Sequence, residues 1–157
     1  MISFRVLKSF DAGLIAKLIK LEIDNLGREA AMNQWHLPVI IRYGKFIIAE
    51  NEHGDIIGVC EMLRSWGPPG QLPGAFIHSF YIEEACRHRG IGKKLLENVI
   101  EILKKDGFKS VQLTVDPDNK PALSLYGSFG FEKKLLEIGE YGEGRDRFLM
   151  ELVFDGK

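Results

Sequence analysis

A basic, glycine-rich stretch in the middle of the chain constrains the fold more than any other feature. Residues 87–92 read RHRGIG and lie between an apolar run at 75–82 and a segment at 92–106 whose apolar residues recur at helical spacing. The run predicts a β-strand, and the segment predicts an amphipathic helix. The glycines therefore open a helix, where unpaired backbone N–H groups and the positive end of the helix dipole bind anions. The sequence predicts a phosphate-binding site at this point.

Two common nucleotide-binding motifs do not fit this stretch. A Walker loop requires Ser or Thr after Gly-Lys, whereas Lys94 follows Gly92 and Lys93 here. A dinucleotide-binding fingerprint requires a third glycine where Leu95 stands, and it belongs to the first strand-to-helix turn rather than to the middle of a chain. The plain alternative for so short a motif is a helix entrance with a solvated, charged rim and no ligand.

Length and composition fit one small domain that spans residues 1–157. The chain has 45% hydrophobic residues, enough for a single core, and its 21 basic and 22 acidic side chains leave a net charge of −1. This balance favours neither nucleic acid nor an anionic membrane as a partner. Cys60 and Cys86 show no metal-ligand spacing, so no metal is expected. The start of the chain lacks a signal-peptide pattern, and we expect a soluble, cytoplasmic protein.

The remaining elements follow from periodicity and turn residues. Asp11 is expected to cap a first helix that Gly27 interrupts, and the stretch 28–43 suggests further helix that Pro38 breaks. Strands are expected at 3–7, 46–50, 56–63, 110–115, 131–138 and 147–154. Asp118 is expected to cap a helix after the strand at 110–115, and the Pro/Gly-rich residues 66–74 are expected to form a loop.

A second motif follows the predicted central strand and helix. Its members keep the spacing N-x-x-A-x-x-L-Y-x-x-x-G-F, and they are Asn119, Ala122, Leu125, Tyr126, Gly130 and Phe131. With both motifs in this order, residues 76–131 resemble the GNAT superfamily of N-acetyltransferases, which bind acetyl-CoA. The resemblance implies an α/β fold with a mixed, mostly antiparallel twisted sheet of six to seven strands and about four flanking helices. The amino-terminal third carries no family motif.

The resemblance also implies which residues hold acetyl-CoA. Backbone groups of Phe80, Tyr81 and Ile82 would pair with the pantetheine arm, as a peptide adds to a sheet edge. The pyrophosphate would be wrapped by the loop residues Arg87, His88, Arg89, Gly90, Ile91, Gly92 and Lys93. Asn119 matches a residue that bonds the cofactor, although it could equally cap a helix.

Tyr126 and His78 are the catalytic candidates. Tyr126 matches the family tyrosine that protonates the departing thiolate, and its plain alternative is a packed core tyrosine. His78 resembles a strand histidine of arylalkylamine acetyltransferases, and its reference pKa of about 6.5 suits a general base. The glutamate that some members use stands as Thr114 here, which does not ionise. The other candidates for the base are Glu61, Glu83, Glu84 and a water relay.

The resemblance implies direct transfer of acetyl from acetyl-CoA to a primary amine of a small metabolite or of a protein amino terminus. No covalent enzyme intermediate is needed. The alternative is a noncatalytic acyl-CoA sensor or interaction module on the same fold, and a homodimer is compatible with the family. Glu22, Glu29 and Glu61 could attract a cationic amine, with solvated surface charge as the default explanation.

Overall fold

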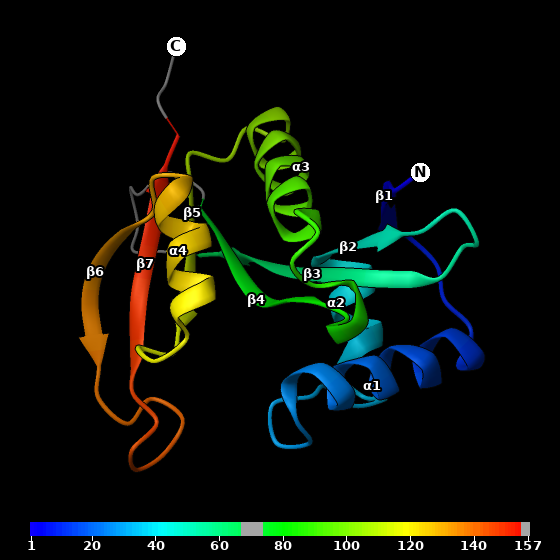
Figure 1. The fold of residues 1–157 in the computed structure, drawn as a ribbon, viewed down its shortest axis with the longest axis horizontal. Coiled ribbons are helices and arrows are strands. Elements are labelled where there is room, and N and C mark those ends of the chain that lie inside the picture. Colours follow the sequence, from blue (N-terminus) through cyan, green and yellow to red (C-terminus); the bar gives the residue numbers. More distant parts are fainter. Residues whose placement is uncertain (67–73, 155–157) are drawn as a thin grey trace. The chain divides into compact units, whose positions relative to one another are not determined.

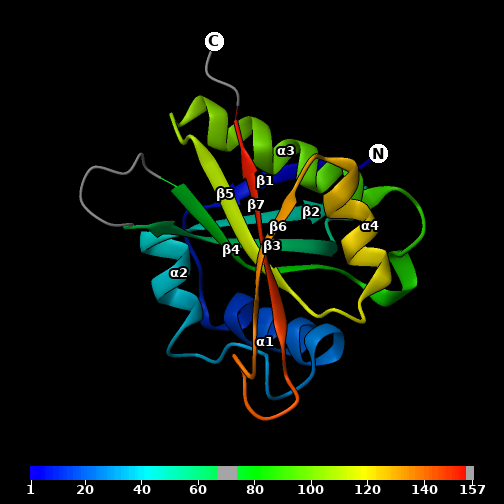
Figure 2. The same cartoon turned by 90° about the vertical axis from the view of Figure 1, so that its left-hand side faces the viewer.

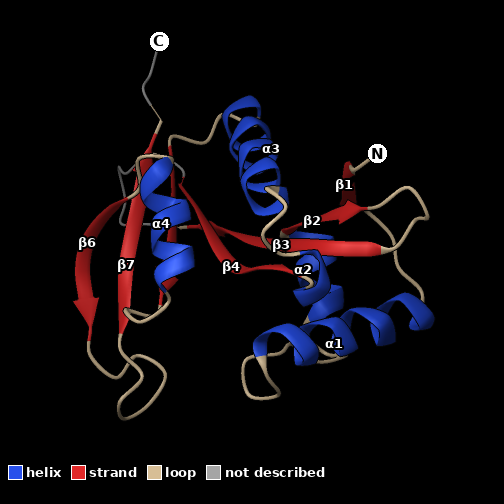
Figure 3. Cartoon of the chain, viewed as in Figure 1, coloured by secondary structure: helices blue, strands red, loops and turns tan. Residues whose placement is uncertain are grey.

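The computed structural model describes residues 1–66 and 74–154. Within these ranges the fold is mixed α/β, with four α-helices and seven strands in the hydrogen-bonded order β1-β2-β3-β4-β5-β7-β6 (Figure 3). The expected fold class is confirmed, because β4 and β5 pair in parallel while the other registered neighbours are antiparallel. The described chain forms two compact units, one of residues Met1–Leu63 and Ser79–Ile100 and the other of Arg64–His78 and Glu101–Lys157.

The first unit is built on antiparallel strands covered by two amino-terminal helices. Strands β1 (Ser3–Leu7), β2 (Lys45–Glu50) and β3 (Ile56–Ser65) pair in sequence, and α1 (Ala12–Leu26) and α2 (Leu37–Tyr43) lie beside them (Figure 1). Leu18, Leu37 and Phe46 are fully buried where these helices meet the sheet. A continuous apolar core therefore holds α1 and α2 against β2 and β3.

Local signals explain the ends of α1 and correct the prediction for α2. The Asp11 Oδ1 accepts a hydrogen bond from the Leu14 N–H at 2.8 Å, and Gly27 ends α1 with a φ of 86°. The helix expected over residues 28–43 is wrong for its first part, because α2 begins only at Leu37. Pro38 stands in the first turn of α2, where its missing N–H breaks no helical hydrogen bond, so it starts this helix rather than breaking it.

The second unit is built around β5 (Ser110–Val115). This strand pairs in parallel with Gly74–Ile77 of β4 (Gly74–Ile82) and antiparallel with β7 (Arg147–Val153), which in turn pairs with β6 (Glu132–Glu137). Figure 2 shows β5, β7 and β6 running side by side, with α4 (Lys120–Ser128) along them. Every residue of β6 is exposed, as befits a charged strand at the edge of the sheet.

Three details of the sequence prediction change or fall outside the described residues. Asn119, rather than Asp118, caps α4, and its Oδ1 accepts from the Ala122 N–H at 3.2 Å. The predicted Pro/Gly-rich loop at 66–74 lies, apart from its two ends, outside the described residues. The central helix, α3 (Ile91–Lys105), begins one residue earlier than expected. No α-helix in the described ranges has the length and apolar character that crossing a bilayer requires.

Candidate functional site

The glycine-rich stretch forms a tight turn that leads from β4 into α3. A short 3-10 helix, η1 (Glu84–Cys86), follows the strand, and the chain then bends through two residues with positive φ, His88 at 60° and Gly90 at 73°. The Gly90 carbonyl accepts the first hydrogen bond of α3 from the Lys94 N–H at 3.2 Å. Gly90 is therefore the residue at the helix entrance, in a conformation that favours glycine.

The turn leaves a run of backbone donors without partners. Within the described parts of the chain, the N–H groups of residues 88–93 have no backbone or side-chain acceptor. Alternating backbone conformations of this kind point successive N–H groups into one concave surface, which binds anions. The positive end of the α3 dipole lies at the same place. The phosphate site that the sequence predicts at this turn stays a prediction.

The basic side chains around the turn differ in their surroundings. The Arg87 Nε donates to the Ile82 carbonyl at 2.9 Å, and its Nη2 donates to the Asn25 Oδ1 at 3.0 Å. Arg87 thus ties the turn to the end of β4 and to α1. His88, Arg89, Lys93 and Lys94 are exposed or nearly so, and they surround the free N–H groups with positive charge.

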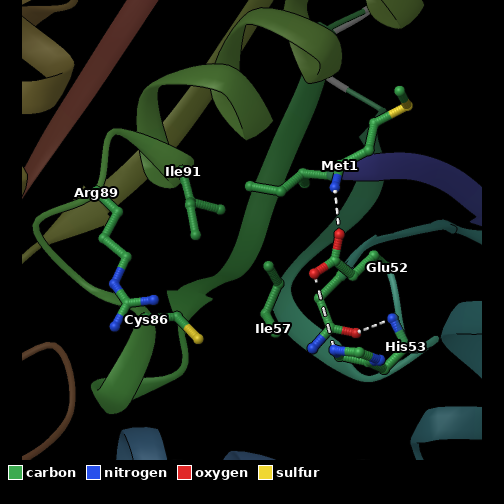
Figure 4. A pocket seen from close by; sticks show the side chains of 9 residues that line it. Met1, Glu52, His53, Ile57, Cys86, Arg89 and Ile91 are labelled. Carbon is green, nitrogen blue, oxygen red and sulfur yellow. Dashed lines mark hydrogen bonds and ion pairs between the residues drawn. The ribbon is translucent and has the colours of Figure 1, made fainter.

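A pocket of about 300 Å³ borders this turn on the side of the β2–β3 connection (Figure 4). Cys86, Arg89 and Ile91 form one wall, and Ile57 and Glu52 belong to the facing wall. Glu52 pairs with the Met1 amino group at 3.2 Å. Because the pocket lining includes this carboxylate and excludes Gly90 and Gly92, the pocket does not provide the phosphate site itself.

Residues Phe80, Tyr81 and Ile82 lead directly into the turn. The β4–β5 register ends at Ile77, so these three residues extend past the last pair with β5. Phe80 and Ile82 are half-buried and Tyr81 is buried, as expected for alternating faces of a strand. A Cβ at Gly58 would lie 2.6 Å from the Ile82 Cδ1 and 3.4 Å from the Tyr81 carbonyl, so a larger residue there requires the end of the Ile82 side chain to shift.

Asn119 and Tyr126 lie on one helix of the second unit. Asn119 caps α4, and Tyr126 stands near its end, only 6% exposed. The Tyr126 ring packs against Phe131 with 5.6 Å between the centroids. Within the predicted motif, Asn119 therefore caps the start of α4, and Tyr126 makes an aromatic contact near its end.

The other catalytic candidate, His78, also belongs to the second unit. His78 is exposed on β4. Thr114, which stands where some family members have glutamate, has its hydroxyl 3.4 Å from the Tyr141 hydroxyl. The Arg147 guanidinium lies over the Tyr141 ring at 5.1 Å and pairs with Asp116 at 3.2 Å. Thr114 thus lies at one end of a polar chain through Tyr141, Arg147 and Asp116, which no sequence spacing predicts.

Glu22 and Glu61 are buried, although solvated surface charge was the default expectation for both. Each is 0% exposed, Glu22 on α1 and Glu61 on β3. Burial, and then the neighbouring Glu22 carboxyl, raise the pKa of Glu61 to about 10. Glu61 therefore keeps its proton at neutral pH, which argues against it as a general base. Helical periodicity could have found Glu22, because it falls one turn after the buried Leu18.

Burial also raises the pKa of two other titratable side chains in the first unit, Tyr81 and Cys60. The pKa of Tyr81 is raised by burial and by the charges of Glu22 and Glu61. Burial and the charge of Glu61 raise the pKa of the Cys60 thiol well above its usual value. A protonated, fully buried thiol is a poor nucleophile, which agrees with a packing role for Cys60.

Comparison with known proteins supports what the geometry indicates. The model of the acetyltransferase (GNAT) family matches residues 16–131. The chain belongs to this family. Its solved neighbours include Arabidopsis thaliana NAA60 in complex with acetyl-CoA, with a TM-score of 0.79 at 19% identity over 98% of this chain and 100% of the other. The cosubstrate of the family is acetyl-CoA, and its members are acyltransferase enzymes.

Two relatives differ in the acceptor that their names give. A Sulfolobus acidocaldarius N-alpha-acetyltransferase is 30% identical over 69% of this chain and 68% of its own length. A Bacillus subtilis protein that carries the name of a phosphinothricin acetyltransferase is 33% identical over 54% of this chain. The chain spans about half of that second relative, 51% of its length. The comparisons define the family and leave the acceptor open.

Proposed function

We propose that this chain transfers the acetyl group of acetyl-CoA to a primary amine of a small metabolite or of a protein amino terminus. The observation that carries the proposal is the run of unpartnered N–H groups at 88–93. These donors, with the exposed Lys93 and Lys94 beside them, fit a diphosphate in number and charge. When bound, acetyl-CoA supplies an acetyl group that is activated as a thioester.

The residues before the turn have a complementary role in this proposal. Phe80, Tyr81 and Ile82 extend past the pairing with β5, and their backbone would hold the amides of the pantetheine arm as an added strand does. Backbone N–H groups in this segment would also bind the negative charge that develops on the carbonyl oxygen during attack. Such stabilisation contributes about 3–4 kcal/mol per donor in acyl transfer.

Two side chains would move protons. Tyr126, buried at the end of α4, would donate the proton that the departing thiolate takes up. His78, exposed on β4, would accept the proton of the amine directly or through water, because its reference pKa of about 6.5 lies near neutral pH. The amine must be neutral to attack, so one group has to take this proton.

The proposed class of acceptor, a primary amine, is based on the names of two relatives. Phosphinothricin and an α-amino group both present a primary amine, which supports this class without choosing between its members. The free thiols of Cys60 and Cys86 agree with the cytoplasm as the location. A homodimer stays an expectation from the family.

The deciding experiment measures coenzyme A release from the purified chain with acetyl-CoA and a panel of amines and short peptides. We expect turnover with at least one amine, and a rise in melting temperature with coenzyme A. Gly90→Glu, which alters the helix entrance, should lose the stabilisation by coenzyme A. Stabilisation by coenzyme A without turnover on any acceptor would favour a noncatalytic sensor, and no stabilisation at all would contradict the proposed cofactor site.

A further inference from the structure

A buried acidic cluster lies beneath the strand segment that is proposed to hold the cofactor. Its members come from three elements of the first unit: Glu22 from α1, Glu61 from β3 and Tyr81 from β4. The two carboxyls are 0% exposed and the tyrosine is 5% exposed. Tyr81 lies between Phe80 and Ile82, so the cluster shares their stretch of backbone while its side chains occupy the opposite face.

The polar atoms of this cluster are poorly satisfied. Within the described residues, the Glu22 Oε1, both Glu61 oxygens and the Tyr81 hydroxyl are buried without a hydrogen-bond partner of good geometry. The groups that act on the pKa of Glu61 are the Glu22 carboxyl and the Ser79 hydroxyl. Two carboxyls and a phenol that face one another in this way can share one proton, but they lack donors for the remaining oxygens. Buried acceptors without donors cost stability.

We propose that Glu22, Glu61 and the Tyr81 hydroxyl bind a positively charged group of the acceptor, and that the chain therefore prefers diamines and polyamines. This inference rests on the proposed function. An alkylammonium group carries three N–H donors and one positive charge, which matches the free oxygens and the negative charge of the pair. The tyrosine ring adds an apolar wall for the methylene groups beside the charge.

The bound ammonium must be a second one, distinct from the amine that is acetylated. A neighbouring carboxylate stabilises the charged form of an amine and raises its pKa. A raised pKa opposes deprotonation of the amine, and the amine must lose its proton before it can attack the thioester. The carboxyls thus suit a charge that persists through the reaction, while the reacting amine lies at the other end of the same molecule.

The cover over the cluster is a short stretch of chain after α1. The Met32 N–H donates to the Glu22 Oε2, whereas residues 27–30 and 33–36 on either side are exposed. An entering ammonium would replace the Met32 N–H as the partner of Glu22, and residues 27–36 would move aside. The cluster only binds the acceptor, so the acetyl-transfer step itself requires no further movement of residues 27–36.

The test compares two acceptors that share a four-carbon chain and differ in a second amino group, putrescine and n-butylamine, by coenzyme A release. We expect the wild-type chain to show a kcat/KM at least about tenfold higher for putrescine, the ratio that one charge-assisted hydrogen bond supplies. In Glu22→Gln, which removes the negative charge of the pair, this ratio should fall toward one through a rise in KM for putrescine. The kcat/KM for n-butylamine should stay within about threefold of wild type. Asp24→Asn, an exposed carboxyl change on the same helix as Glu22, is the matched control and should keep the ratio.

A binding measurement decides the matter independently of turnover. Putrescine should raise the melting temperature of the wild-type chain and of Asp24→Asn, but not that of Glu22→Gln. Equal kcat/KM for the two amines in wild type, or an unchanged ratio in Glu22→Gln, would overturn the inference. Loss of activity toward both amines alike would also overturn it, because the cluster would then support only the fold. Putrescine binding that depends on Glu22, with no transfer to any amine, would refute the proposed function and leave the binding site standing.

Discussion

Gly90 is the residue at which the proposed cofactor site can be tested most sharply. It holds a φ of 73° at the entrance of α3, and a Cβ placed on it would meet no atom within 4 Å. Any side chain there costs about 1–2 kcal/mol of backbone strain, without a steric clash. Gly90→Glu adds a negative charge to this strain, at the place where the donors of residues 88–93 converge.

The size of the charge effect follows from Coulomb's law. A carboxylate about 5 Å from one phosphate charge, at an effective dielectric constant of about 20, is repelled by about 3 kcal/mol. Because about 1.4 kcal/mol corresponds to a factor of ten, we expect Gly90→Glu to weaken coenzyme A binding more than about 100-fold. Gly90→Asn is the control, since asparagine tolerates positive φ and brings no charge.

The assay is titration calorimetry with coenzyme A at low salt, on variants whose melting temperatures lie close together. Gly90→Asn should bind within about tenfold of wild type, and the deficit of Gly90→Glu should shrink as salt screens the repulsion. Equal affinities for Gly90→Glu and wild type would refute the assignment of residues 88–93 to the diphosphate.

Four further changes test separate parts of the structure. Tyr126→Phe should lower kcat at least about tenfold while the Kd of acetyl-CoA stays the same, and equal rates would remove its role as proton donor. His78→Ala should abolish the acidic limb of the rate–pH profile, so an unchanged profile would exclude it as the base. Asn119→Ala should lower the free energy of unfolding by about 1 kcal/mol in chemical denaturation, because α4 loses its cap. Since Glu61 has a pKa of about 10 in the fold and about 4.3 when unfolded, its contribution to stability is complete below pH about 4 and is lost as pH rises toward 10. Glu61→Gln should therefore gain in melting temperature over wild type between pH about 5 and 9, and parallel pH curves would contradict the buried, protonated state.

Local signals predicted most of the elements because the determinants of each are close in sequence. The strand at 110–115 and the cap at Asp11 were predicted as the structure has them. Pro38 was misread because the same missing N–H that breaks a helix interior is harmless in a first turn. Asn119 and Asp118 are both good caps, and only the backbone conformation decides between them.

The candidate site likewise contains features that neighbouring residues determine and contacts that depend on tertiary packing. The helix entrance at 88–93 depends on neighbouring residues, so glycines and cations in sequence were enough to predict it. The buried pair of Glu22 and Glu61 joins residues from a helix and a strand, and no short motif records that distance. The hydroxyl contact between Thr114 and Tyr141 likewise depends on how a loop after β6 folds back. Contacts of this kind follow from tertiary packing, which periodicity does not encode.

The side chain of Arg87 has a consequence for anyone who would engineer this chain. Its guanidinium joins the Ile82 carbonyl and the Asn25 side chain, so the turn at 87–92 is held to the last turns of α1. A foreign amino-terminal helix in place of α1 would remove this link unless an amide acceptor is kept at position 25. Libraries built on the first helix should therefore hold Asn25 constant, so that the proposed cofactor site keeps its support.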